Sequence, residues 1–319
     1  MNSVDNREYA GRQAWLRRFG KSIVRYRALL FMLLPGVIVF ILFNYLPMFG
    51  IVIAFKKIDY SLGILHSPFV GLENFRFLFA TTDAFRITRN TLLYNAVFII
   101  CDVFFAVFVA VAMRELWQPR ISKIYQTIII LPYFLSMVVV AYLVYGFLHP
   151  QLGFFNQVLR RIGQKEINWY SEPKYWPVIL PLVHWWKQLG YKSVVYLAAI
   201  AGIDQDLYEA AVIDGSGKWA QIRYITIPLL IPTMVIMFLL ALGNIFRADF
   251  GLFYQVTMNS TMLYEVTDVI DTYVYRALTS MNNIGMSSAA SVFQSFVGAI
   301  TVITANLVVR RIDSSQALF

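Results

Sequence analysis

The chain has few of the residues that catalysis and cofactor binding usually require. Its one cysteine, Cys101, excludes a disulfide within the chain and lies in an apolar run, where the expected role is that of a small buried hydrophobic side chain. The three histidines show no metal-ligand spacing, and no Ser/His/Asp or Cys/His nucleophile set is evident. Charged residues make up 14% of the 319 residues, against about 25% in an ordinary soluble domain. These shortages argue against a soluble enzyme.

Apolar residues are abundant instead, at 59% of the chain, and they form runs of about 20 residues, long enough to cross a bilayer. The runs are continuous, without the alternation of a β-barrel, so the sequence predicts an all-α integral membrane protein. We expect a basic N-terminal tail (1–27), a membrane domain (28–309) and a C-terminal tail (310–319). The six expected membrane spans are 28–54, 91–113, 124–148, 176–199, 227–246 and 289–309.

Basic residues indicate how these spans are oriented. The net charge of +9 would suggest nucleic acid in a soluble protein, but here the Lys and Arg residues lie mostly in tails and loops. They are densest before the first span, and no cleavable signal peptide is evident. We therefore predict both termini in the cytoplasm, together with the polar segment 204–227 between the fourth and fifth spans, and no nucleic-acid partner.

Segment 204–227 shows helix and turn signals. Asp206 and Glu209 have the spacing of a capping box, which predicts Asp206 as the N-cap of a short helix. Asp214-Gly215 is a turn signal that ends this helix. A second short helix is expected over 218–225, and Pro228 would then open the fifth span. The result is a helix–turn–helix pair that lies across the cytoplasmic membrane face.

The spacing of this segment resembles the "EAA" loop of permease subunits in binding-protein-dependent ABC importers, although Ile227 stands where that family usually has Leu. The resemblance implies a coupling helix that docks on a separate ATPase subunit. A Gly215-Ser-Gly217-Lys218 run lacks the remaining positions of a P-loop, so we reject nucleotide binding on this chain. The alternative for the segment is an interfacial amphipathic loop. The residues assigned to ATPase coupling are Glu209, Ala210, Ala211, Asp214, Gly215, Ile225 and Pro228.

Other stretches extend the resemblance over most of the chain. Residues 124–136 are similar to the sugar-permease branch that includes maltose-type permeases, and 44–50, 70–75 and 266–276 are similar to its lipoprotein-B-like subgroup. The resemblance implies a type I importer permease fold in the bacterial inner membrane. It also implies four kinds of partner: a second homologous permease, two ATPases that hold ATP and Mg²⁺, an extracytoplasmic solute-binding protein and a carbohydrate. No cofactor is expected on this chain.

Polar residues inside the spans are the part of the sequence that indicates the kind of cargo. A charged side chain within a bilayer costs free energy, so such residues usually have a function. Five of them occupy one face of the fourth span, and Asp102 and Asn95 share a face of the second. We predict that the face of the fourth span lines a translocation cavity and that Lys187 and Lys192 favour an acidic, alginate-like uronate sugar. For Asp102 we expect pairing inside the bundle rather than direct contact with the substrate. The alternative is that the lysines snorkel or pair with Asp102. The substrate-path candidates are His184, Lys187, Gln188, Tyr191, Lys192, Asp102 and Asn95.

Three further expectations concern the loops and the competing functions. The charged residues after the fifth span, such as Asp268 and Arg276, could meet the binding protein, but a solvated face is the simpler expectation. A secondary transporter driven by an ion gradient would show inverted repeats and broken helices, and the sequence indicates neither. A membrane enzyme with Asp102 and His184 as an acid/base pair is the remaining alternative.

Overall fold

The structure is a computed structural model that describes residues 25–115, 119–280 and 282–317. Most of the predicted N-terminal tail and the last two residues of the C-terminal tail lie outside these ranges. The described part is helical, and its extended pairing is limited to one isolated bridge between Lys56 and Phe69. The chain divides into two compact units, Met1–Ile53 and Ala54–Phe319. The prediction of an all-α chain is confirmed for the described residues.

The first unit is built on one helical run. It comprises α2 (Arg27–Phe40), a π-helical turn (Ile41–Tyr45) and a 3₁₀ segment (Leu46–Phe55) that continues past the boundary of the unit. The run has 29 residues and its side chains are almost all exposed, although they are strongly apolar. Such a surface is suited to lipid rather than to water.

The second unit is organised around two long helices that pack along each other, α5 (Thr82–Arg114) and α9 (Trp176–Ala201). Helix α5 begins nine residues before the start of the second expected span (91–113). The reason is that Thr81 provides an N-cap, whose hydroxyl accepts from the Ala84 N–H at 3.2 Å. Helix α9 is one continuous helix, although Pro181 lies inside it. Gly190 in this helix allows close packing, since a Cβ there would overlap the Ile129 carbonyl.

The third expected span, 124–148, is broken, and the prediction of one continuous span was wrong. It consists of α6 (Pro119–Ile130), a 3₁₀ turn (Leu131–Phe134) and α7 (Met137–Leu148), and its two arms meet at 99°. Pro132 cannot donate a helical hydrogen bond, and Ser136 restarts the chain as the N-cap of α7. The sequence had indicated no broken helix.

The segment between α9 and the fifth expected span also differs from the prediction. The N-cap of α10 (Gln205–Ile213) is Asp204 rather than Asp206, because the Asp204 carboxylate accepts from the Asp206 N–H at 3.0 Å. The second short helix, α11 (Lys218–Gln221), does not stop before Pro228. It passes through a π-helical turn (Ile222–Thr226) into α12 (Ile227–Leu242), which gives one helix over Lys218–Leu242. The wider turn accommodates the proline ring, which would clash in a regular helix.

The remaining elements form the connections and the last long helix. Short helices follow the first run, and α8 follows α7. A π-helical turn and two short helices then precede the last long helix, α15, which contacts α12 and α14. These elements are α3 (Gly63–His66), α4 (Phe77–Ala80), α8 (Phe154–Arg161), the turn Gly251–Val256, α13 (Tyr264–Thr267), α14 (Ile270–Thr279) and α15 (Ile284–Ile312).

Four of the helices are long and apolar enough to cross a membrane: Arg27–Phe55, Thr82–Arg114, Lys218–Leu242 and Ile284–Ile312. The bent α6–α7 pair makes five if it counts as one span. The fourth expected span, α9, has 26 residues, but its lysines and other polar side chains lower its hydropathy. The described residues therefore establish a helical membrane protein with four or five strongly apolar helices.

Candidate functional site

A cavity of about 340 Å³ lies between α5, α9 and the end of α12. Its polar lining comes from three places: the middle of α5, the polar face of α9 and the chain that follows α12. Apolar side chains such as Phe98 and Met237 complete the wall. The polar lining residues are Asn95, Asp102, His184, Lys192, Tyr196, Asn244 and Arg247.

Three of these residues form a charged cluster across α5 and α9. The Asp102 Oδ2 atom accepts from the Lys192 ammonium and lies 3.1 Å from the His184 Nε2. The imidazole stacks on the Phe98 ring at 4.0 Å between centroids. Asp102 and His184 are buried, and the other carboxylate oxygen and the other ring nitrogen have no hydrogen-bond partner among the residues that the structure describes. Both atoms are buried below the surface of the cavity, so they are unpaired polar groups in its wall rather than groups that a ligand can reach.

Asn95 and Arg247 shape the end of the same cavity. The Asn95 amide donates to the carbonyls of Ile245 at 2.8 Å and of Arg247 at 3.0 Å, so it holds the chain that leaves α12. The Arg247 guanidinium donates to the Ser295 hydroxyl of α15 at 2.7 Å. In the sequence, Arg247 is only one of the charged residues that follow the fifth expected span. Arg247 reaches the cavity because the chain turns back after α12, and no pattern in the sequence predicts that turn.

The other predicted residues of α9 lie elsewhere. The Lys187 ammonium is directed at the break in the third span, where it donates to the carbonyls of Tyr133 at 2.9 Å and Leu135 at 2.5 Å. Tyr191 stacks on the Tyr133 ring at 4.3 Å, and Gln188 is half-buried outside the cavity lining. The structure therefore brings Asn95, Asp102, His184 and Lys192 together but separates them from Lys187, Gln188 and Tyr191.

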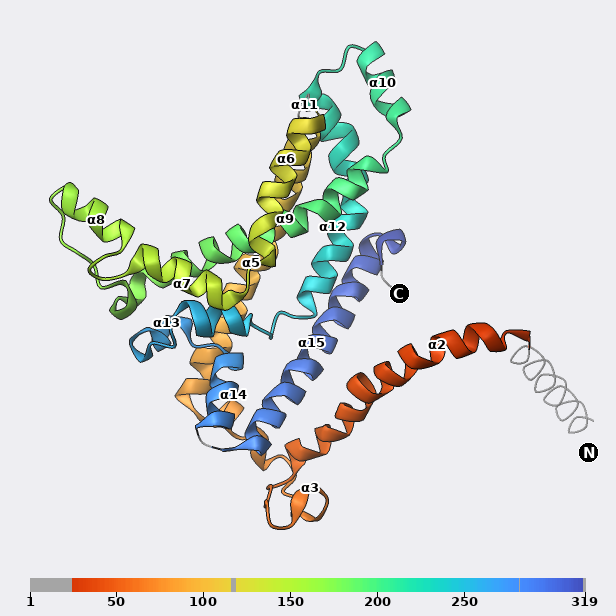
Figure 1. Ribbon diagram of the computed structural model, residues 1–319. Coiled ribbons are helices and arrows are strands. Elements are labelled where there is room, and N and C mark those ends of the chain that lie inside the picture. Colours follow the sequence, from red (N-terminus) through yellow and green to blue (C-terminus); the bar gives the residue numbers. More distant parts are fainter. Residues whose placement is uncertain (1–24, 116–118, 281, 318–319) are drawn as a thin grey trace, which may run out of the picture. The chain divides into compact units, whose positions relative to one another are not determined.

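The predicted coupling residues lie at the end of the helices where α10 and α11 project (Figure 1). Glu209, Ala210, Asp214, Gly215 and Pro228 are exposed, while Ala211 and Ile225 are half-buried. Apolar side chains share this exposed surface, and the sequence did not predict them. In a membrane protein, apolar residues at a docking surface look no different from apolar residues that face lipid. They are Leu207, Val212, Ile213 and Trp219, which we name the α10–α11 face.

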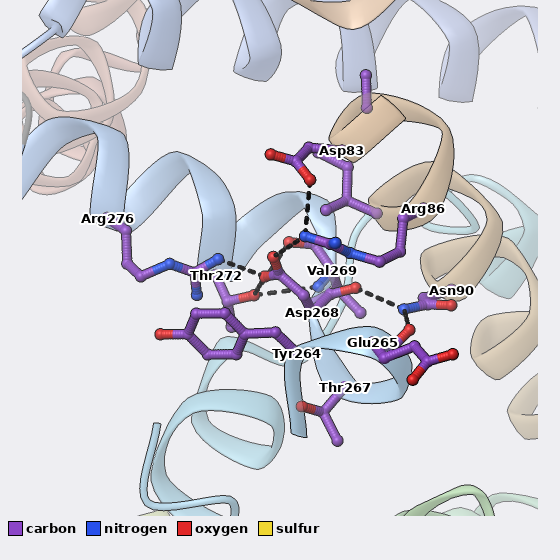
Figure 2. A network of polar contacts seen from close by, with 12 residues as sticks. Asp83, Arg86, Asn90, Tyr264, Glu265, Thr267, Asp268, Val269, Thr272 and Arg276 are labelled. Carbon is purple, nitrogen blue, oxygen red and sulfur yellow. Dashed lines mark hydrogen bonds and ion pairs between the residues drawn. The ribbon is translucent and has the colours of Figure 1, made fainter. Parts of the chain in front are cut away.

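A second polar network joins the start of α5 to α13 and α14 around Asp268 (Figure 2). Its carboxylate accepts from Arg276 at 2.6 Å and from the Thr272 hydroxyl at 2.9 Å, and it lies 3.6 Å from the Arg86 guanidinium. The Asn90 amide donates to the Asp268 carbonyl at 3.0 Å. Asp268 is 2% exposed, so the expectation of a solvated face was wrong for this residue. Arg86 also pairs with Asp83 at 3.0 Å, so two arginines face two aspartates and the charges cancel within the network.

A third buried carboxylate, Asp271, lies near this network on α14. It accepts from the Ala248 N–H at 2.7 Å and from the Gln294 amide at 3.1 Å. Burial raises the pKa of this carboxyl above its ordinary value, and the hydrogen bonds partly oppose that shift. The contact fixes the chain after α12 to α15.

Metal or covalent chemistry finds no support in the described part of the chain. No group of three or more His, Cys, Asp or Glu side chains that could hold a metal ion occurs there. A bundle of apolar helices, an internal charged cavity and an exposed apolar surface at one end together define the class of membrane transport proteins.

Comparison with known proteins gives the family. Residues 87–314 match the model of the "Binding-protein-dependent transport system inner membrane component" family. The chain belongs to this family and is a transport subunit of an ABC importer rather than an enzyme.

Two relatives from Bacillus subtilis (strain 168) match over most of their length. The polygalacturonan/rhamnogalacturonan transport system permease protein YteP is 35% identical over 91% of this chain and 90% of its own. Protein LplB is 30% identical over 93% of both chains.

Two solved structures are also similar, each at 34% identity. One belongs to a bacterial ABC transporter involved in the import of the acidic polysaccharide alginate, with a TM-score of 0.84 over 93% of this chain and 99% of that chain. The other shows a bacterial alginate ABC transporter in complex with an alginate pentasaccharide-bound periplasmic protein, with a TM-score of 0.83 over 92% and 98% of the two chains.

Proposed function

We propose that this chain is one of two homologous permease subunits through which an acidic oligosaccharide or polysaccharide, delivered by a solute-binding protein, enters the bacterial cell. The names of the relatives support a carbohydrate cargo, since two solved neighbours import alginate and one curated relative transports polygalacturonan and rhamnogalacturonan. The observation on this chain that carries the acidic preference is the cavity between α5, α9 and α12.

The charge of that cavity favours an anion. Lys192 and Arg247 contribute two positive charges, and Asp102 contributes one negative charge. The balance of these three charges is positive, so the cavity attracts a uronate carboxylate, and more strongly where the protein screens that charge less than bulk water does. The Lys192 ammonium is partly exposed and has donors beyond the one that Asp102 accepts from, so it can donate to a uronate carboxylate.

We infer six membrane spans. They are the Arg27–Phe55 run, α5, the bent α6–α7 pair, α9, the Lys218–Leu242 helix and α15. The polar α9 is acceptable as a span because its charged side chains pair with α5 or cap the carbonyls at the α6–α7 break. An even number of spans places both termini on one side, and the basic tail before the first span assigns that side to the cytoplasm. The segment between α9 and α12 then lies in the cytoplasm as well.

We propose that the α10–α11 face is the surface on which an ATPase subunit docks. Ile213 and Trp219 are 85% and 83% exposed, yet a cytoplasmic loop has no lipid to cover them. Glu209 beside them offers a carboxylate to a basic groove. ATP and Mg²⁺ would be held by the ATPase pair, and their closure would move this face. The permease itself would alternate between outward- and inward-facing states without covalent chemistry.

Lys192 provides the test of the acidic cargo. In a Lys192→Met variant of the reconstituted importer, we expect uptake of any sugar to fall, because Asp102 loses the partner of a buried ion pair. Uptake of an oligouronate should fall about tenfold further than that of a neutral oligosaccharide of equal length, because a charge-assisted hydrogen bond to the cargo is also lost. Lys187→Met is the matched control: it removes a lysine of the same helix that does not line the cavity, so any loss should be equal for both sugars. An equal loss for both sugars in the Lys192 variant would contradict the acidic subsite.

Gly215 provides the test of the coupling loop. It ends α10 at a φ of +80°, and a Cβ there would meet no atom within 4 Å, so a substitution acts through the backbone alone. A β-branched residue is strongly disfavoured in this region, whereas Asn tolerates it. We expect Gly215→Val to reduce uptake per ATP hydrolysed severalfold while Gly215→Asn retains most of it. Equal coupling in the two variants would show that this turn has no role in transmission.

A further inference from the structure

Helix α10 buries one of its side chains, that of Tyr208, against the rest of the protein. All nine residues of α10 are described, and Tyr208 is the one among them that is buried, at 6% exposure. Its neighbours Leu207 and Glu209 are exposed. If a partner pulls or pushes on this helix, the force can reach the bundle through Tyr208 or along the chain at either end of the helix.

The contacts of Tyr208 are specific and connect to two other helices. The Arg114 guanidinium, in the last turn of α5, lies 3.7 Å from the centre of the phenol ring. The phenol hydroxyl is 3.0 Å from the Thr226 hydroxyl, which is fully buried. The neighbouring Glu115 pairs with Lys218 at 2.8 Å, which also ties the end of α5 to the start of α11. A buried hydrogen bond and a cation–π contact of this kind hold the ring in one place.

These contacts gather the three helices that line the cavity. Arg114 ends α5, which carries Asp102 three turns earlier, at about 18 Å along the axis. Thr226 is the last residue of the π-helical turn that runs into α12. The chain enters α10 directly from α9, after 202–204.

We propose that Tyr208 is the positioning residue that passes a displacement of α10 to α5 and to α12, and thereby opens or closes the charged cavity; this rests on the proposed docking role of the α10–α11 face. The π-helical turn at Thr226 is the hinge on the α12 side, because such turns interrupt the regular hydrogen bonding of a helix and Pro228 follows two residues later. On the α5 side the helix acts as a lever, since it runs unbroken from Thr82 to Arg114.

Substitutions that remove the two contacts of Tyr208 separately test this role. They are made in the complete importer with its ATPases and loaded binding protein. Tyr208→Phe removes the bond to Thr226 and keeps the ring, Arg114→Gln removes the cation and keeps the phenol, and Tyr208→Ala removes both. The matched controls are Tyr26→Phe and Arg25→Gln, an exposed tyrosine–arginine pair just before α2, with the cation 5.8 Å from the ring centre. Three quantities are measured: co-purification of the ATPase, ATP hydrolysis and uptake per ATP.

We expect all variants to retain the ATPase, because the docking surface is unchanged. Uptake per ATP should fall about fivefold in Tyr208→Phe and Arg114→Gln and at least about tenfold in Tyr208→Ala. The two controls should match the wild type. Wild-type coupling in Tyr208→Ala would overturn the proposal, and so would loss of the ATPase in Tyr208→Phe, since Tyr208 would then only shape the docking surface. If Tyr208→Ala does not fold, the uptake per ATP of Tyr208→Phe and Arg114→Gln tests the proposal, and wild-type values in both would overturn it. A wild-type chain that binds no ATPase would refute the proposed function instead.

Discussion

An Asp102→Asn variant is expected to lose carbohydrate uptake by at least about a hundredfold, because breaking a buried ion pair costs about 3–5 kcal/mol. The substitution leaves Lys192 without its counter-charge next to His184, inside the cavity that we assign to the cargo. Uptake into vesicles and the melting temperature of the purified complex are measured together, since the same substitution lowers stability.

A double variant separates the two effects. Asp102→Asn with Lys192→Met removes the unpaired charge and should recover most of the melting temperature. Uptake should remain low, because the cavity has lost both charges of the Asp102–Lys192 pair. Recovery of uptake along with stability would show that the Asp102–Lys192 pair only holds α5 against α9, and normal uptake in the single variant would contradict its role altogether.

The second large effect is expected at the α10–α11 face. Ile213→Glu and Trp219→Glu should each weaken the association with the ATPase at least about a hundredfold, because a charge would be buried without a partner in the docked complex. Co-purification of the ATPase with the tagged permease measures the effect directly. The permease itself should remain folded, since both side chains are exposed in it.

Leu65→Glu is the matched control for these variants. Leu65 is 84% exposed and lies on α3 in the loop after the first helical run, which we place on the outer side of the membrane. The control should retain the ATPase. Equal recovery of the ATPase from Ile213→Glu, Trp219→Glu and Leu65→Glu would contradict docking at the α10–α11 face.

Composition and motif spacing were sufficient to predict the fold class and the family. Apolar runs of membrane length predicted a helical membrane protein, and the Glu209–Pro228 spacing indicated the family of importer permeases. The end of α10 at Gly215 was also predictable, because a turn signal acts locally.

Features that depend on contacts between distant residues were not predictable. At the break in the third span, Lys187 of α9 donates hydrogen bonds to carbonyls about 50 residues earlier in the chain. No pattern within the third span alone predicts that contact. Asp268 appeared solvated because its burial depends on the distant start of α5, where Asn90 donates to its carbonyl and Arg86 lies 3.6 Å from its carboxylate. The division of the α9 polar face between a cavity and a structural contact follows from the position of α5, which helical periodicity alone does not give.

The central claim is that ATP hydrolysis on partner subunits drives a carbohydrate through this chain. It is tested by uptake of a labelled oligouronate into vesicles that contain the complete importer, with the binding protein outside and either ATP or ADP enclosed. The account predicts uptake with ATP, no uptake with ADP, and no effect of ionophores that collapse the ion gradients. Uptake that persists with ADP and stops when the gradients are collapsed would contradict it and would identify a secondary transporter.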